Sequence, residues 1–171
     1  MLGEKTNVGT HWVCVCYDKD GNLKWEDDFD NLVVNEGLND LLQNQFNGSG
    51  YTATWFVGLK ESGAVVAGDT MASHSNWSEI TDYTTAGGSG AATARPVAVL
   101  ASASSQSVVT STAAVFSING TVCVAGGFLA TKVTVGGNLG VLYGAGDFTA
   151  IRSVIDGDVV NVSLTLSASA S

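Results

Sequence analysis

Apolar and polar residues alternate with a period of two in several parts of the chain, and this pattern predicts short β-strands. The last strand, expected over 159–166, has the most regular alternation, and its apolar face carries Val160, Val162, Leu164 and Leu166. Residues 11–17 alternate in the same way, and a polar turn at 18–22 leads into a return strand that starts at 23–26. These two segments therefore predict a β-hairpin near the N-terminus.

A second hairpin is predicted around Asn119-Gly120, which stands between the apolar segments 114–118 and 121–125. An Asn-Gly pair is typical of a two-residue type I′ turn, in which both residues have positive φ. The register would then place 114–118 against 121–125. Both faces of this ribbon are mostly apolar, so we expect it in the middle of a sandwich, covered on both sides.

One helix is predicted over 35–46, where apolar residues recur at helical spacing. Asn35 is the expected N-cap, and Asn47-Gly48 follows the last turn. The apolar stripe, which we expect to pack on the sheet, consists of Leu38, Leu41, Leu42 and Phe46.

About eight short strands separated by turns every eight to twelve residues predict an all-β fold. We expect an antiparallel β-sandwich, jelly-roll-like, with one N-terminal helix. The chain lacks the Cys–Trp–Cys spacing of immunoglobulin domains, which favours the jelly roll. Residues 1–50 would form an N-terminal arm, a hairpin and the helix packing on the sandwich, and residues 51–171 the β-sandwich domain.

Charge is scarce and unevenly distributed. The 171 residues carry a net charge of −9, yet Arg95 and Lys132 are the only charged residues from Tyr83 to Gly146. Such a stretch suggests a surface hidden against another subunit, although a surface of Ser, Thr and Gly would also be soluble. Seven basic residues without a cluster exclude an ordinary nucleic-acid interface. No apolar run is long enough to cross a membrane, and no signal peptide is visible.

Cofactor chemistry is not expected. The three cysteines, Cys14, Cys16 and Cys123, fit no disulfide framework and predict reduced thiols. No CxxC pair or cluster of histidines suggests a metal site. The acidic residues of the 18–22 turn have the spacing of a calcium loop, but its remaining ligands are missing, so we interpret the segment as a polar turn.

Catalysis is not expected either. His74 follows Asp69 by five residues, but no GxSxG elbow accompanies it, and a structural role for this histidine is favoured. The Gly-rich segment 87–90 has no following lysine and is not a phosphate loop. A carboxylate pair beside aromatic residues is also typical of sugar binding or glycosidase activity. Its members, the alternative glycan contacts, are Trp77, Glu79, Asp82 and Tyr83.

Contacts to a protein partner are a further possibility. The acidic run 26–30 would be solvated in most proteins, but it could also meet a basic surface. The candidate partner contacts are Trp12, Trp25, Asp27, Asp28, Asp30 and Arg95.

Several residue strings occur in an order that resembles a family of small virion proteins of tailed bacteriophages, encoded among head genes. These strings are WFVGLK (55–60), GDTMASH (68–74) with Trp77-Ser78-Glu79, FSING (116–120), LYGAGDF (142–148), Arg152-Ser153-Val154 and the closing Gly157-Asp158 strand. The resemblance extends from about Trp25 onward. The loop at 86–94 departs from it, being longer than expected.

The resemblance implies a capsid decoration (cement) protein, made in the bacterial host cytoplasm and located in the virion, on the outer surface of the capsid. It would form a homotrimer and clamp neighbouring subunits of the major capsid protein. A flexible N-terminal arm could add a strand to the sheet edge of a neighbour. The alternative is a tail fibre or tail-associated module that binds host surface glycans.

Overall fold

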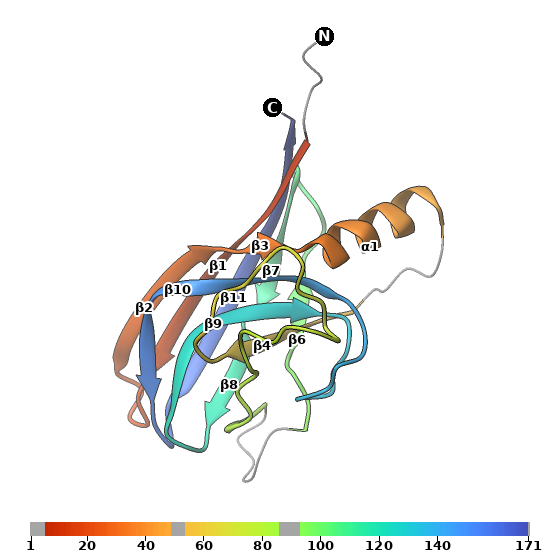
Figure 1. The fold of residues 1–171 in the computed structure, drawn as a ribbon. Helices are drawn as coiled ribbons and strands as arrows, with labels where there is room; N and C mark the ends of the chain where they lie inside the picture. Colours follow the sequence, from red (N-terminus) through yellow and green to blue (C-terminus); the bar gives the residue numbers. More distant parts are fainter. Residues whose placement is uncertain (1–5, 49–53, 86–92, 171) are drawn as a thin grey trace.

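The computed structural model describes residues 6–48, 54–85 and 93–170. The Gly-rich segment 87–90 lies outside these ranges. The fold is all-β and antiparallel with one helix, as predicted (Figure 1). The elements are β1 (Thr6–Tyr17), β2 (Leu23–Asp30), β3 (Leu32–Val33), α1 (Asn35–Phe46), β4 (Trp55–Lys60), β5 (Tyr83–Thr84), β6 (Val97–Leu100), β7 (Ser107–Thr112), β8 (Ala114–Ile118), β9 (Val122–Ala130), β10 (Leu142–Val154) and β11 (Val159–Ala170).

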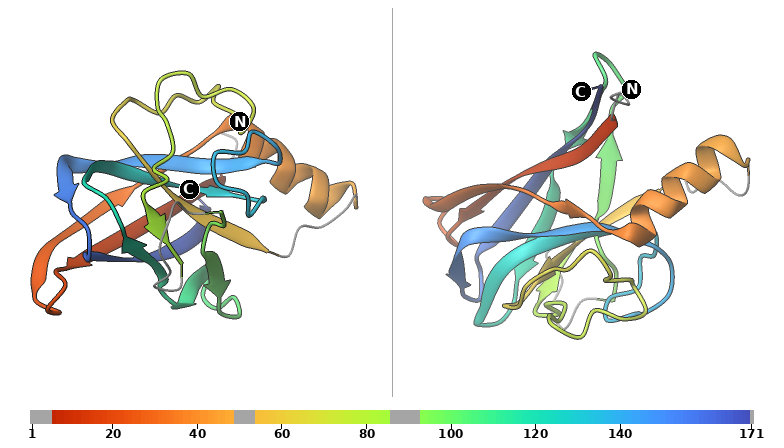
Figure 2. Two further views of the ribbon diagram at one scale, coloured as in Figure 1. Left: turned by 90° about the horizontal axis from the view of Figure 1, so that it is seen from below. Right: turned by 45° about the horizontal axis from the view of Figure 1, so that its top comes forward.

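The strands form two layers that are joined along both sides (Figure 2). The hydrogen-bonded order is β2-β1-β11-β7-β6-β4-β9-β10-β3, and β8 pairs with β11 and β5. The pair β6–β7 connects the layers on one side. On the other side only Asn31 separates β2, which pairs with β1, from β3, which pairs with β10. The chain therefore encloses a core between the layers and has few open sheet edges.

The N-terminal hairpin is present and forms part of the sandwich itself. Asp18 stabilises its turn, because its Oδ1 accepts hydrogen bonds from the backbone N–H groups of Asp20 (2.9 Å) and Asn22 (2.8 Å). On its other side β1 pairs with β11 over the whole range from Thr6 to Tyr17. The first described residues are thus a strand of this chain's own sheet, and the hairpin β1–β2 shares that sheet with the C-terminal strand β11.

The hairpin predicted at Asn119-Gly120 is wrong. β8 pairs with β11 and β5, whereas β9 pairs with β10 and β4, so the two segments belong to different layers. Neither turn residue has the positive φ that a type I′ turn needs. Instead the Asn119 N–H donates to the carbonyl of Asp82. Pairing with distant strands has overridden a strong local turn signal.

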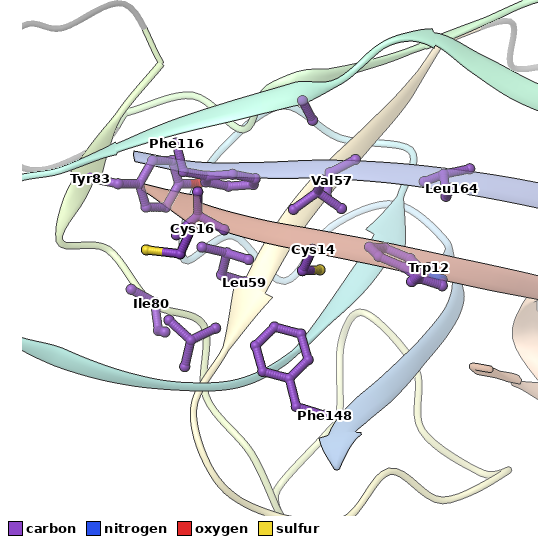
Figure 3. Packing of buried hydrophobic residues seen from close by; sticks show 14 of the residues in the cluster. Trp12, Cys14, Cys16, Val57, Leu59, Ile80, Tyr83, Phe116, Phe148 and Leu164 are labelled. Carbon is purple, nitrogen blue, oxygen red and sulfur yellow. The ribbon is translucent and has the colours of Figure 1, made fainter. Parts of the chain in front are cut away.

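The core lies between the layers and is rich in aromatic residues (Figure 3). Trp12 stacks on Phe29 with ring centroids 5.6 Å apart, and Phe29 meets the edge of Phe148 at 5.5 Å. Cys14 and Cys16 are buried on the same face of β1 as Trp12, and all three cysteines are free thiols. Fully burying aromatic side chains of this size removes roughly 150–250 Å² of surface each, so these rings supply much of the driving force for folding.

Helix α1 has the predicted bounds, but its predicted surroundings are wrong. Val34 is the N-cap and no side chain caps the helix. Among α1 residues only Gly37 is buried, where a Cβ would lie 2.2 Å from the carbonyl oxygen of Tyr143. The remaining helix projects from the body of the sandwich (Figures 1 and 2). The apolar stripe therefore does not pack on the sheet.

Candidate functional site

The six candidate partner contacts do not form one surface. Trp12, Asp27 and Arg95 are buried, and Trp25 is half-buried with its ring against the edge of Phe148. Only Asp28 and Asp30 are exposed, as alternation along β2 requires. The sequence identified the acidic run but could not show which of its members point inward.

Asp27 is an internal ion-pair partner. Its carboxylate accepts hydrogen bonds from Arg152 Nη2 (2.6 Å) and Nε (3.0 Å) and from the backbone N–H of Thr149 (3.2 Å). Burial would raise the pKa of Asp27, but the hydrogen bonds from Arg152 and Thr149 outweigh burial and hold this pKa below its ordinary value. Asp27 therefore joins the inner side of β2 to β10.

The outward side of β2 carries an acidic stripe that consists of Glu26, Asp28 and Asp30. His11 on β1 lies beside it, with Nδ1 2.9 Å from Asp30 Oδ1 and Nε2 3.7 Å from Asp28 Oδ2. All of these side chains are well exposed, so each pair contributes little to stability. The stripe can instead attract a basic surface over several ångströms, or repel another copy of this acidic chain.

Arg95 and Glu79 form a buried bidentate ion pair. Arg95 Nε lies 2.7 Å from Glu79 Oε1, and Nη2 lies 2.8 Å from Oε2. Arg95 also donates to the carbonyl of Lys132, and the backbone N–H of Gly136 donates to Glu79 Oε2. These three hydrogen bonds to its carboxylate make Glu79 a structural link between the 61–79 loop and the 132–137 loop.

The other glycan candidates are also dispersed. Tyr83 lies in the core, where burial raises the pKa of its hydroxyl group. Asp82 is exposed. Trp77 is buried, and its ring lies between His74 and Phe128, at centroid distances of 3.9 and 5.2 Å. Because Trp77 is only 5% exposed, its ring offers no platform on which a sugar could stack.

A cavity of about 520 Å³ lies next to this cluster. His74 Nδ1 lies 3.1 Å from the carbonyl oxygen of Trp77, and Asp69 accepts a hydrogen bond from Trp77 Nε1 at 3.0 Å, so the loop that forms the cavity is held by internal polar contacts. Its lining combines small polar and apolar groups, which include Met71, Ser73, His74, Ser75, Ser78 and Asn138. Glu79 also lines this cavity, with its carboxylate paired to Arg95.

A second surface is formed by β6, β7 and β8. Residues 97–118 contain no charged side chain. The exposed large apolar residues of this segment are Val97, Val99, Val109 and Val115. β9, in contrast, is almost entirely buried in the chain's own core. The uncharged stretch is thus partly explained by the fold itself, and the part that needs another explanation is the outer surface of 97–118.

The third surface is the exposed stripe of α1. Phe46 is 80% exposed and Leu42 53%, and Leu38 and Leu41 are also exposed. Beside the helix lies a groove with a volume of about 360 Å³. Its lining consists of Asp40, Leu41, Asn44, Gln45, Trp55, Val108, Tyr143 and Leu166. The sequence identified these helix residues but assigned them to internal packing.

Glu36, which the sequence analysis did not single out, anchors the base of α1. Its Oε2 accepts hydrogen bonds from the backbone N–H groups of Met71 (2.9 Å) and Leu142 (2.7 Å). An acidic residue in the first turn is a common helix feature, so the sequence alone gave no signal for this role. Together with Gly37 it fixes one end of α1 on β10.

Within the described ranges, no group of three or more His, Cys, Asp or Glu side chains is arranged to hold a metal ion. Among the same residues, no helix is both long and apolar enough to span a membrane. Comparisons with protein-family models, with curated proteins and with solved structures found no match.

Proposed function

We propose that this chain is a structural protein of a tailed bacteriophage virion, a capsid decoration protein that binds the outside of the head and clamps neighbouring subunits of the major capsid protein. The observation that carries the proposal is the uncharged outer surface of residues 97–118, with exposed valines on three successive strands. The order of the family-like strings supports the phage assignment.

The chemistry of this surface suits a broad protein interface. Burying a charged group costs several kcal/mol unless it is paired, whereas valine, serine and threonine can be covered at little cost. The chain also keeps four of its seven basic side chains in internal ion pairs. These pairs are Lys24–Asp158, Lys60–Asp147, Arg95–Glu79 and Arg152–Asp27. A protein that clamps others needs a surface that can be buried against its partners and a rigid body. The uncharged surface of 97–118 suits the first need, and the internal ion pairs suit the second.

The experiment is reconstitution on phage heads that lack the protein. Purified chain is mixed with expanded heads, and co-sedimentation is measured for the wild type and for Val99→Glu. The variant adds a carboxylate to the uncharged surface and should weaken binding at least tenfold. Ile151→Glu on β10, which also replaces an exposed apolar residue, is the matched control and should bind like the wild type. Absence of wild-type binding, or equal binding by Val99→Glu, would contradict the proposal.

A second candidate is a tail-associated module that binds host surface glycans, favoured by the 520 Å³ cavity and its hydroxyl-bearing lining. Trp77→Ala would disturb the core, so the sharper variant is Ser75→Trp, which fills the cavity from an exposed position. Wild-type binding to labelled host cells that Ser75→Trp abolishes would support this function. Equal signals from both proteins would exclude the cavity as the glycan site.

A further inference from the structure

The stripe on α1 is arranged like one side of a helix-packing interface. Leu38, Leu42 and Phe46 follow one another at intervals of four residues, and Leu41 adjoins them. This spacing is typical of a helix that buries one face against an apolar surface. Here Phe46 and Leu42 are more than half exposed, whereas Leu38 and Leu41 are each a little over one-third exposed, so Phe46 and Leu42 would gain most from burial. Burial of the exposed side chains of this stripe would therefore favour association through α1.

The apolar stripe of α1 and the groove adjoin each other and share Leu41. α1 diverges from the strands β7, β11 and β1, and the groove lies between them (Figure 2). A second hollow of about 330 Å³ continues it along the strands and shares Leu41, Val108, Tyr143 and Leu166 with the groove. The convex stripe and the concave groove therefore lie side by side on the same chain, which allows one copy to receive the helix of another.

We propose that α1 and this groove form a self-association surface, in which the occupant is α1 of a second copy of this chain. Phe46, the last residue of α1, is the main anchor, and it enters the neighbour's groove beside Tyr143 and Leu166.

Low local charge permits a second copy at this surface, and the area offered suits a specific interface. A chain with net charge −9 repels its own copies over most of its surface, but the groove contains a single charged residue, Asp40. Glu36, the other acidic residue near the helix start, is turned inward to Met71 and Leu142. The four exposed side chains offer on the order of 400 Å², which is the size of a functional patch on a monomer. With the groove lining added, each copy offers a surface near the lower end of specific protein–protein interfaces, about 600 Å² per partner.

This inference rests on the proposed function, because it assigns to a definite surface the self-association expected of a decoration protein. It is nevertheless tested without heads. Sedimentation equilibrium gives the mass of the purified full-length wild type, of Phe46→Glu and of Leu139→Glu. Leu139 is 72% exposed and lies outside the groove, so this control matches the exposure and the change in charge.

The wild type and Leu139→Glu should be oligomers at micromolar concentration, and Phe46→Glu should be a monomer or dissociate at least tenfold more readily. The second variant, Leu38→Gln/Leu42→Gln, adds no charge, and glutamine is a good helix former. Its oligomer should also dissociate more readily than that of the wild type. A monomeric wild type would overturn the inference, as would an oligomer that survives both variants. Failure of the proposed function has a different signature, namely an α1-dependent oligomer that does not bind heads.

Discussion

The guanidinium group of Arg95 makes two hydrogen bonds to the carboxylate of Glu79, at 2.7 and 2.8 Å, although both side chains are almost completely buried. Arg95 also lies over the ring of Phe128, with Cζ 5.1 Å from the centroid. Two residues that the sequence offered as external contacts thus form an internal link that joins the 61–79 loop to the sandwich.

Removing one member of this pair should be costly, because the other charge remains buried. We expect Arg95→Ala to lower the free energy of unfolding by about 3–5 kcal/mol. Arg95→Lys keeps the charge but cannot reproduce the bidentate geometry, and it should have an intermediate effect. Urea unfolding measures all three proteins. Lys132→Ala, at an exposed position, is the control and should change stability by no more than about 0.5 kcal/mol. Equal losses for Arg95→Ala and Lys132→Ala would contradict the structural role.

The Asp27–Arg152 pair should make the free energy of unfolding depend on pH in the acidic range. The pKa of Asp27 is lower in the folded chain than the value near 3.9 that we expect in the unfolded chain. A lowered folded pKa adds stability above the unfolded pKa, and this gain disappears as the pH falls toward the folded pKa. Asp27→Asn should therefore be less stable than the wild type at pH 7.

The stability difference between wild type and Asp27→Asn should shrink as the pH falls below about 4. Denaturant unfolding at pH 7, 5, 4 and 3 measures it. The control is Asp156→Asn, which alters an exposed loop residue and should differ little from the wild type throughout. A constant difference between wild type and Asp27→Asn across this range would show that the carboxylate does not carry the effect.

Thiol reactivity should separate the cysteines into two classes. Burial raises the pKa of Cys14 far above its ordinary value and the pKa of Cys16 to about 11, whereas Cys123 is exposed. Because the thiolate is the reactive form, a chromogenic disulfide reagent at pH 8 should label one thiol per native chain. The same reagent should label three thiols after denaturation, since the chain has three cysteines. Rapid labelling of two or more thiols in the native protein would place β1 outside the core.

Gly37 should be needed to dock α1. A Cβ at this position would lie 2.2 Å from the carbonyl oxygen of Tyr143, so Gly37→Ala must displace the helix. We expect a loss of about 1–3 kcal/mol in unfolding free energy, as for overpacked cores. The matched control is Gly68→Ala, where a Cβ meets nothing within 4 Å and stability should be almost unchanged. Indistinguishable melting curves for the two variants would mean that α1 is not held as described.

The sequence predicted what depends on local pattern. Alternation located β11 and β1, the polar turn located the first hairpin, and helical spacing located α1. It failed where long-range pairing decides the outcome. Asn119-Gly120 has an excellent hairpin signal, but β8 is paired by β11, which begins some forty residues later. The local sequence gives no sign that pairing with β11 is more favourable than the local hairpin.

The candidate sites show the same division between local and long-range information. A periodic apolar stripe indicates that one face of α1 is apolar. The same pattern occurs in a helix that packs on its own sheet and in a helix that packs on a neighbouring chain. Likewise, Asp27 and Asp28 are adjacent acidic residues, and only the pleat of β2 separates an internal ion pair from an exposed charge. The roles of Arg95 and Glu36 arise from segments distant in the sequence, so they required the fold.

The copy number of this chain in purified phage particles tests the central claim most directly. Quantitative mass spectrometry of gradient-purified virions gives the ratio of this chain to the major capsid protein. A decoration protein is expected in hundreds of copies per head, released by mild denaturant together with loss of head stability. A handful of copies, or none, would contradict the proposal.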